Sequence, residues 1–350
     1  MNAEQNNVIK YPKTLVEAVR YFADPAVTLA FFTKLRWPEQ VCCPHCGSTN
    51  VLFMAKYSRW KCREGHARPQ FTVKVGTIME DSPLSLDKWA VAFWLEVNAK
   101  NSISSYELHR ALGITQKSAW FMLHRIRLAV QENSIVKLGG PGSPGVEVDE
   151  TYIGGLARNM HRSKRAGLTG TGGVDKTIVA AVLDRSVVEK KDGKKKVKRI
   201  SRVAACVIPN TQQETLHAVI HKHVEPGSNI YSDAHKGYNG LNEQFIHAAI
   251  DHAEKYVDGL IHTNGLENFW SLFKRCIKGT HVSVEPFHLF RYLDSEGFRF
   301  NNRDVKDGER FVMALKGIVG KRITYKALTA APEGAPASGS GEENGASLPN

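Results

Sequence analysis

The sequence of 350 residues contains no long apolar run, and its start lacks the basic and apolar segments of a secretory signal. Both absences argue against a spanning or exported protein, so we expect a cytoplasmic protein with no membrane role. Cysteine is scarce, and the six cysteines of an intracellular chain are more often metal ligands or buried thiols than disulfides.

Acidic residues are also in deficit. The 47 Lys and Arg residues outnumber the 35 Asp and Glu residues, which gives a net charge of +12. A basic protein of this kind favours a polyanionic partner, and nucleic acid is the commonest one. A hydrophobic fraction of 42% is ordinary for a globular protein and allows a sizeable core in at least one of its domains.

Four residues have the spacing of a tetrahedral zinc site. Cys43 and Cys46 form one tight knuckle, and Cys62 and His66 form a second one after a hairpin-length segment. Because the second knuckle is Cys-x-x-x-His, the histidine is the least certain ligand. Cys42 is adjacent to the first ligand and is an alternative to it in a shifted register. The pattern predicts a zinc ribbon.

Residues 104–112 and 116–130 are predicted as two helices joined by a short turn at Gly113. This is the outline of a helix-turn-helix, although many such helix pairs are only structural. The second helix carries basic residues that we predict as DNA contacts. They are Lys117, Arg125 and Arg127.

Carboxylates gather on a later stretch that alternates like a strand, from Glu147 to Gly155, with Asp149 at its centre. Acids on a half-buried strand are costly to desolvate, so a cation is expected among them. Mg²⁺ suits such a site because it takes oxygen ligands. A second short strand ends at Asp233, and a later helix carries Glu267 near its start.

Alternatives remain for this set. Strand alternation places Glu147 on the same face as Asp149, so it is a possible extra ligand. If the helix register differs by one residue, Asn268 replaces Glu267. Lys274 lies two helical turns after Glu267, on the same face, where it would hold a DNA backbone. Arg275 is its alternative in the shifted register.

A basic, glycine-rich stretch follows the first acidic strand and includes Arg158 and Lys164. We predict that it is a mobile loop that orders on DNA.

The segments VDETYIGG, YSDAHKGY and HTNGLENFWSLFKR resemble the catalytic boxes of the DDE transposases of bacterial insertion sequences. The likeness is to the ISXO2-like subgroup, which begins with a zinc ribbon, and it extends from Thr14 to Asn302. Any one box is a weak signal, but three in order after a ribbon are a specific one.

The resemblance implies an α/β fold, with a ribonuclease-H-like mixed sheet preceded by the ribbon and the helix-turn-helix-like region. It implies a DDE transposase that binds transposon ends and carries out metal-dependent strand cleavage and strand transfer. Asp149, Asp233 and Glu267 would hold two Mg²⁺ or Mn²⁺ ions, and the zinc would be structural.

The implied partners are double-stranded DNA, as terminal inverted repeats and as target, and further copies of the chain in a homodimer or larger assembly. The implied location is the bacterial cytosol, at the nucleoid. The competing hypotheses are a non-catalytic DNA-binding regulator derived from a transposase and a structure-specific nuclease on the same fold.

The predicted boundaries follow changes in composition. They are an N-terminal helical segment at residues 1–37, a zinc ribbon at 38–76, a helix-turn-helix-like region at 77–135, a catalytic domain at 145–304, a C-terminal helical extension at 305–329 and a disordered tail at 330–350.

Overall fold

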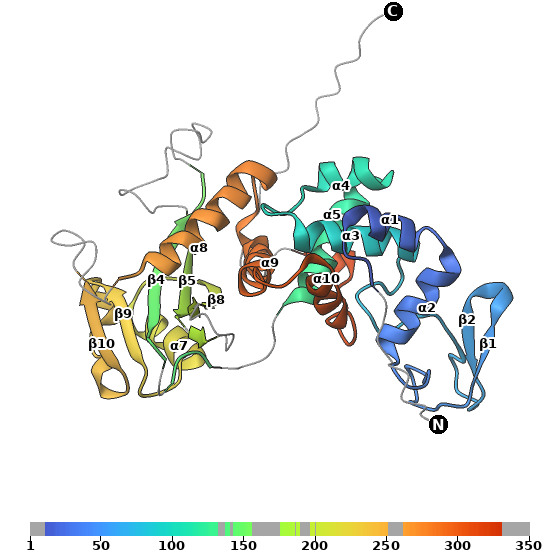
Figure 1. Cartoon of the computed structure of the whole chain (residues 1–350), viewed down its shortest axis with the longest axis horizontal. Coiled ribbons are helices and arrows are strands. Elements are labelled where there is room, and N and C mark those ends of the chain that lie inside the picture. The colour runs from blue at the N-terminus through green and yellow to red at the C-terminus, as the bar shows by residue number, and fades with distance from the viewer. Residues whose placement is uncertain are drawn as a thin grey trace, which may run out of the picture.

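The fold is taken from a computed structural model of the chain. The described residues are 11–131, 137–140, 143–155, 176–185, 187–189, 197–199, 201–250 and 262–330. The molecule is elongated, with a β-sheet and its helices at one end, a helical module in the middle and a small β-hairpin unit at the other end (Figure 1). None of the described helices is long and apolar enough to cross a bilayer.

The main sheet is mixed, as the sequence predicted. Its strands are β4 (Val146–Ile153), β5 (Thr177–Asp184), β8 (Arg202–Ile208), β9 (Asn229–Asp233) and β10 (Ile246–Ile250). Their order is β10-β9-β4-β5-β8, so the acidic strand β4 is central. It pairs antiparallel with β5 and parallel with β9. The edge strand β10, parallel to β9, was not predicted.

Helices cover both faces of this sheet. On one face α7 (Gln213–His223) packs on alternate residues of β4, among them Val146 and Val148. On the other face α8 (Asn264–Arg275) and α9 (Leu289–Asn301) share a core with Ile153. Strand alternation therefore directs Glu147 and Asp149 towards α8.

A short antiparallel hairpin extends from the sheet region. It consists of β6 (Val187–Glu189) and β7 (Val197–Arg199), and Val187 pairs with Arg199. Residues 190–196, which connect the two strands, lie outside the described residues.

The helical module is built from both ends of the chain. Its helices are α1 (Leu15–Phe22), α2 (Pro25–Arg36), α3 (Leu86–Asn98), α4 (Ser105–Leu112), α5 (Gln116–Val130), α10 (Asp307–Lys316) and α11 (Tyr325–Thr329). Phe311 of α10 contacts the rings of Phe22, Phe31 and Trp94. Helix α10, which comes late in the chain, is thus part of the core that the N-terminal helices form.

The predicted pair of helices and its turn are present. Ser104 and Glu107 form a capping box at the start of α4, and Gly113 ends that helix with φ of 60°. Thr115 then caps α5 by accepting a hydrogen bond from the backbone of Ser118. From Met122 to Val130 every residue of α5 is buried, so its C-terminal half is a core element.

The module and the sheet are joined through α9. Asn301 at its end exchanges two hydrogen bonds with the backbone of Val203 in β8, at 2.8 and 3.0 Å. On the module side, Glu96 of α3 is paired with Arg127 of α5 at 3.1 Å and with Arg299 of α9 at 3.8 Å. All three side chains are buried, so the joint is a charged network with little access to water.

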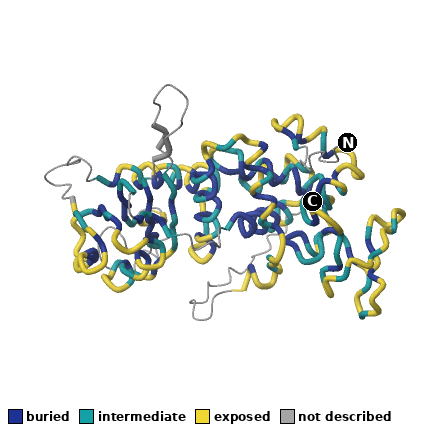
Figure 2. The backbone as a smooth tube through the Cα atoms, turned by 60° about the horizontal axis from the view of Figure 1, so that its bottom comes forward, coloured by how far each residue is buried: buried dark blue, intermediate teal, exposed yellow. Residues whose placement is uncertain are grey.

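The small unit at the other end has three antiparallel strands, β1 (Val51–Met54), β2 (Arg59–Cys62) and β3 (Gln70–Phe71). Trp60 stacks on Phe71 with centroids 5.9 Å apart, and Trp37 packs against both rings. Figure 2 shows that exposed residues dominate this end, whereas buried residues concentrate in the helical module and the sheet.

Candidate functional site

The acids of β4 have different surroundings. Glu147 is buried: its Oε1 lies 2.7 Å from Arg185 Nε, and its Oε2 accepts a hydrogen bond of 2.8 Å from the backbone N–H of Leu266. His262 Nδ1 lies 3.5 Å from the same carboxylate. Glu147 therefore fixes the first turn of α8, where N–H groups and helix dipole favour an anion.

This contact changes the interpretation of two residues. Thr263, the residue before α8, makes no capping hydrogen bond, so the cap contact comes from Glu147 instead. Gly265 is needed because a Cβ there would lie 2.8 Å from Glu147 Oε2. The paired and buried carboxylate of Glu147 is thus a poor candidate for the extra metal ligand that strand alternation had suggested.

Asp149 of β4 contacts α8 one turn further along that helix than Glu147 does. Trp270 Nε1 donates to Asp149 Oδ2 at 2.9 Å. Burial raises the pKa of the Asp149 carboxyl to about 7; Glu150 and Asp233 also raise it, against the Trp270 hydrogen bond. A carboxyl in this state favours a nearby cation, because a positive charge would stabilise its ionised form.

Asp233 lies at the same end of the sheet. The pairing of β4 with β9 ends at Glu147 and Tyr231, and the two aspartates each follow two residues later. Asp233 Oδ1 accepts a hydrogen bond of 3.1 Å from the backbone N–H of His235. The two aspartates therefore lie at the same level of neighbouring strands, just past the point where β4 and β9 stop pairing, while Asp149 stays paired with β5 and Asp233 with β10.

Glu150 is a fourth carboxyl near this edge. The hydroxyl of Tyr238 donates to its Oε2. Burial raises the pKa of the Glu150 carboxyl, the Tyr238 hydrogen bond opposes that shift, and Asp233 adds to it. Burial and the neighbouring acids, Glu150 foremost, raise the pKa of the Tyr238 hydroxyl well above its usual value. Glu150 was not among the predicted ligands, because alternation sets it on the face opposite Asp149.

Glu267 is exposed on α8, three residues before Trp270. A spacing of three keeps it on the side of the helix that faces Asp149, and Lys274, four residues after Trp270, shares that side. Asn268 precedes Trp270 by two residues, which directs it to the opposite side. The helix geometry thus favours Glu267 over Asn268.

The carboxylates do not converge on one point. Within the described ranges, the one group of three or more metal-type ligands within 4.8 Å of one another is the cysteine and histidine set. Two ions about 4 Å apart, each about 2.1 Å from its oxygens, allow ligands of different ions to lie up to about 8 Å apart. The donor set, all carboxylate oxygens with a raised pKa at Asp149 and Glu150, fits hard divalent cations.

The four predicted zinc ligands are brought together. Cys43 Sγ lies 3.3 Å from His66 Nε2, and Cys46 Sγ lies 3.6 Å from Cys62 Sγ. Burial raises the pKa of the Cys43 thiol, but hydrogen bonds from the backbone of His45 and Cys46 outweigh it and lower the value to about 7. Thiolate character and this spacing fit a tetrahedral zinc ion. Cys42 is not part of the group.

The basic residues predicted to contact DNA differ in their exposure to solvent. Lys117 and Arg275 are exposed. Lys274 is half-buried, and burial lowers the pKa of its ammonium although the nearby Asp149 opposes that shift. Arg158 and Lys164 lie outside the described residues.

Arg125 and Arg127 require a correction. The Arg127 side chain is 1% exposed and bound to Glu96, and the Arg125 guanidinium stacks on Phe121 and donates to Glu80 O at 3.1 Å. The prediction that they contact DNA was wrong, because both are buried in the helical module. Two residues apart on α5, Arg125 and Arg127 lie on opposite sides of the helix and do not form one basic face, and the distant partner of Arg127 was not visible in the sequence.

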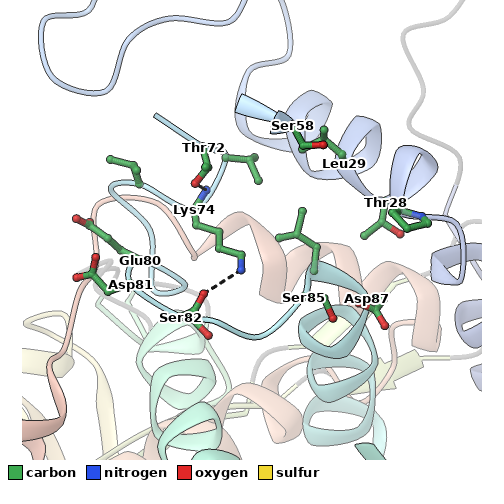
Figure 3. A pocket seen from close by; sticks show the side chains of 14 residues that line it. Thr28, Leu29, Ser58, Thr72, Lys74, Glu80, Asp81, Ser82, Ser85 and Asp87 are labelled. Atoms are coloured by element: carbon green, nitrogen blue, oxygen red, sulfur yellow. Dashed lines mark hydrogen bonds between the residues drawn. The ribbon is translucent and has the colours of Figure 1, made fainter. Parts of the chain in front are cut away.

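A hollow of about 500 Å³ lies between α2 and the segment from Thr72 to Asp87 (Figure 3). Its lysine, Lys74, is directed to the backbone, donating to Ser82 O at 3.0 Å and to Leu84 O. Because the lysine is already bound and the lining includes Glu80, Asp81 and Asp87, this hollow is unsuited to a nucleic acid backbone.

The fold and these clusters define an α/β protein of the ribonuclease-H-like transposase class that carries a zinc-ribbon-like cluster near its N-terminus. The model of the ISXO2-like transposase domain matches residues 137–301, and that of the transposase zinc-ribbon domain matches residues 26–67. The chain belongs to the ISXO2-like transposase family.

Two relatives agree with this placement. An uncharacterized protein in transposable element ISH50 of Halobacterium salinarum is 26% identical over 288 residues, which is 79% of this chain and 90% of the relative. An uncharacterized transposase-like protein of Haemophilus influenzae is 35% identical over 107 residues, 30% of this chain and 85% of the relative. No solved structure matches the chain.

Proposed function

We propose that this protein is a DDE transposase that binds the ends of an insertion sequence, cleaves a DNA strand there and joins the freed end to target DNA. The observation that supports the proposal is that Asp149 and Asp233 lie at the same level of neighbouring strands, on the side of the sheet covered by α8, where burial and the nearby acids raise the pKa of Asp149. Burial and repulsion between the acids destabilise the ionised carboxylates of Asp149 and Glu150. A bound cation would offset that cost.

We assign Asp149, Asp233 and Glu267 as the residues that would hold the divalent ions. Two bound divalent ions, Mg²⁺ or Mn²⁺, would activate the attacking oxygen and stabilise the leaving one. Trp270 holds the Asp149 carboxylate in place, and Glu147 fixes the start of the helix that carries Glu267. Lys274 binds the DNA backbone beside them.

The reaction has two steps at phosphorus. Water attacks a phosphodiester at the end of the element, and the bond to the 3′ oxygen breaks to leave a 3′-hydroxyl. That hydroxyl then attacks a phosphodiester of target DNA and releases a new 3′-hydroxyl there. The two ends of the element must be held in one complex while they react, so we propose a homodimer or larger assembly on double-stranded DNA.

The test uses purified full-length protein, labelled duplexes that carry the terminal repeats of the element, and a supercoiled plasmid target. Addition of Mg²⁺ should produce a nick at the repeat boundary and covalent joining of the labelled strand to the plasmid, both resolved on denaturing and agarose gels. Specific binding without cleavage would favour a DNA-binding regulator. Cleavage without joining would favour a structure-specific nuclease.

We also propose that Cys43, Cys46, Cys62 and His66 hold a structural zinc ion, and that the unit they support contributes to end binding. The aromatic core around Trp60 is small, so a unit of this size depends on its metal for folding. Tyr57 is exposed and lies beside Arg59, whose guanidinium is 5.6 Å from its ring, a pairing suited to contact with DNA.

Cys62→Ser is therefore expected to lose bound zinc and to weaken end binding by about tenfold or more, or at least about 1.4 kcal/mol. Zinc content would be measured by plasma mass spectrometry and binding by fluorescence anisotropy. Cys42→Ser is the matched control, because this neighbouring thiol is outside the group and should keep both zinc and affinity. Full zinc content in Cys62→Ser would refute the ligand assignment.

A further inference from the structure

Arg185 follows β5 directly and contacts, itself or through Glu147, all three elements that carry the candidate ligands of the divalent ions. Its side chain is directed to the α8 side of the sheet, because alternation sets it on the same face as Leu183, a residue of the core shared with α8. The first contact is with β4, where Arg185 Nε lies 2.7 Å from Glu147 Oε1. Both side chains are largely buried, so water and salt screen this ion pair little.

The second contact is with β9. The guanidinium carbon of Arg185 lies 4.6 Å from the ring centroid of Tyr231. Tyr231 is the register partner of Glu147, so both side chains are on the face of the sheet to which Arg185 is directed. The ring has little freedom to move, because it is buried and packs so closely on Gly145 that a Cβ there would overlap it.

The third contact is with the segment that leads into α8. Arg185 Nη2 lies 2.9 Å from His262 Nδ1 and also donates a hydrogen bond to the backbone carbonyl of His262. Through Glu147, whose Oε2 accepts from the backbone N–H of Leu266, the arginine is linked to the first turn of the helix as well. Arg185 and Glu147 together therefore fix both the entry to α8 and its first turn.

Each residue held in this way lies one or two positions before a candidate ligand. The pairs are Glu147 and Asp149 in β4, Tyr231 and Asp233 in β9, and Leu266 and Glu267 in α8. Two residues of a strand span only about 6.6 Å, so a displacement at the held residue is passed on to the acid that follows it. The relative positions of the three acids thus depend on a common neighbour, Arg185.

We propose that Arg185 is a positioning residue that sets the spacing of Asp149, Asp233 and Glu267, and thereby their affinity for divalent ions. This rests on the proposed function, because those ions belong to it, and it adds a residue that acts on them only through other residues. A guanidinium suits the role, because its donors point in fixed directions and its plane can pack on an aromatic ring. Removing a group that orients metal ligands typically costs about 10- to 100-fold in metal affinity or activity.

Arg185→Lys is the informative substitution. It keeps a positive charge beside the buried carboxylate of Glu147, but a single ammonium cannot hold Glu147 and His262 while packing flat on the Tyr231 ring. A double variant, Arg185→Gln with Glu147→Gln, removes both charges and leaves no unpaired charge in the core. It keeps the proposal testable if the lysine variant does not fold.

Arg310→Lys is the matched control. The side chains of Arg185 and Arg310 are each 11% exposed, and each has an acidic partner, which is Asp307 for Arg310. Arg310 also joins separate elements, because it donates to Asn302 O at the end of α9 and to Asn98 Oδ1 of α3. It belongs to the helical module and contacts none of the strands that carry the acids, so its replacement should affect stability without moving them.

The test measures Mn²⁺ binding to full-length, zinc-loaded protein without DNA. Free Mn²⁺ is quantified by electron paramagnetic resonance, because its signal is lost on binding, and Mn²⁺ that still binds to Asp149→Asn is subtracted. Arg185→Lys and the double variant should raise the dissociation constant by about tenfold or more, whereas Arg310→Lys should stay within about twofold of the wild type. Metal-free melting temperatures should fall by similar amounts in the two lysine variants.

Unchanged Mn²⁺ affinity in folded Arg185→Lys or in the folded double variant would overturn the proposal. An equal loss of affinity in Arg310→Lys would also overturn it, because a general loss of stability would then explain the effect. So would wild-type protein without any Mn²⁺ binding that depends on Asp149.

These outcomes are separate from those of the proposed function. Wild-type protein that cleaves and joins DNA, with unchanged Mn²⁺ affinity in the Arg185 variants, would remove the positioning role alone. Weakened Mn²⁺ binding in those variants, in a protein whose wild type neither cleaves nor joins DNA, would remove the transposase proposal and support the positioning role.

Discussion

Asp149→Asn is expected to abolish strand cleavage and joining, with a loss of about a thousandfold or more in rate. The substitution keeps the shape of the side chain and an oxygen for the Trp270 hydrogen bond, but it removes the charge that would bind the ions. Ion-based stabilisation of the transition state is worth several kcal/mol, and each 1.36 kcal/mol corresponds to about a tenfold change in rate. The rate would be measured as nick formation at the repeat boundary under single-turnover conditions.

The same variant should be no less stable than the wild type. The pKa of the Asp149 carboxyl is about 7 in the folded protein, against an ordinary value of 3.8. Without metal, ionisation of this group therefore lowers the free energy of unfolding as pH rises between those two values. A neutral amide removes that cost. We therefore expect an equal or higher melting temperature for Asp149→Asn at pH 8 in the absence of Mg²⁺, together with unchanged end binding. Loss of end binding in a gel-shift comparison would contradict the assignment.

Two neighbouring residues on α8 provide the control for the third ligand. Glu267→Gln should lose cleavage to a similar extent, because Glu267 shares the side of the helix that faces Asp149. Asn268→Ala should retain it, since Asn268 lies on the opposite side. The reverse outcome would move the ligand to Asn268 and require a different rotation of α8 about its axis.

Glu96→Ala is expected to destabilise the folded protein by about 3–5 kcal/mol, the cost of leaving a buried charge without its partner. The Glu96 carboxylate is fully buried and accepts hydrogen bonds from Ser102 at 2.7 Å, Arg127 at 3.1 Å and Ser295 at 2.8 Å. Its removal leaves the guanidinium group of Arg127 in the core without its acidic partner, whereas Arg299 keeps its pair with Glu296. The free energy of unfolding would be measured by urea denaturation.

Because the pKa of Glu96 is shifted, the stability lost in Glu96→Ala should depend on pH. Burial raises the pKa of this carboxyl, but Arg127 and Arg299 together lower it below its usual value. A lowered folded pKa means stability that is present above the unfolded pKa and lost as pH falls through the folded one. The difference between wild type and Glu96→Ala should therefore shrink on acidification and stay constant near neutral pH.

An exposed ion pair provides the matched control for Glu96. Arg322 and Asp81 lie 2.5 Å apart, but their side chains are 52% and 68% exposed. Asp81→Asn should change the free energy of unfolding by less than about 1 kcal/mol, because water screens such a pair. If both variants lost the same small amount, the network between α3, α5 and α9 would not be the joint that holds the module to the sheet.

The local patterns of the sequence determined much of the fold. Thr177–Asp184 is apolar almost throughout, which suits a strand covered on both faces, and β5 has those limits. Ser104, Glu107 and Gly113 set the ends of α4 through hydrogen bonds within a few residues. The strand β10 was missed because the run from Ile246 to Ile250 is short and contains alanines and a histidine, without the alternation of a strand.

The candidate site, too, was indicated partly by the sequence and decided partly by the tertiary structure. The sequence by itself indicated the candidate residues, namely the cysteine and histidine knuckles and the acids of two strands and of the start of a helix, because the spacing within each motif is local. Only the tertiary structure decided that Glu147 caps α8 and that Arg127 is a core residue paired with Glu96. Whether a charged side chain faces solvent, a metal or a buried partner depends on residues far away in the chain. The spacing of residues along the sequence does not reveal which of those distant residues will be its neighbours.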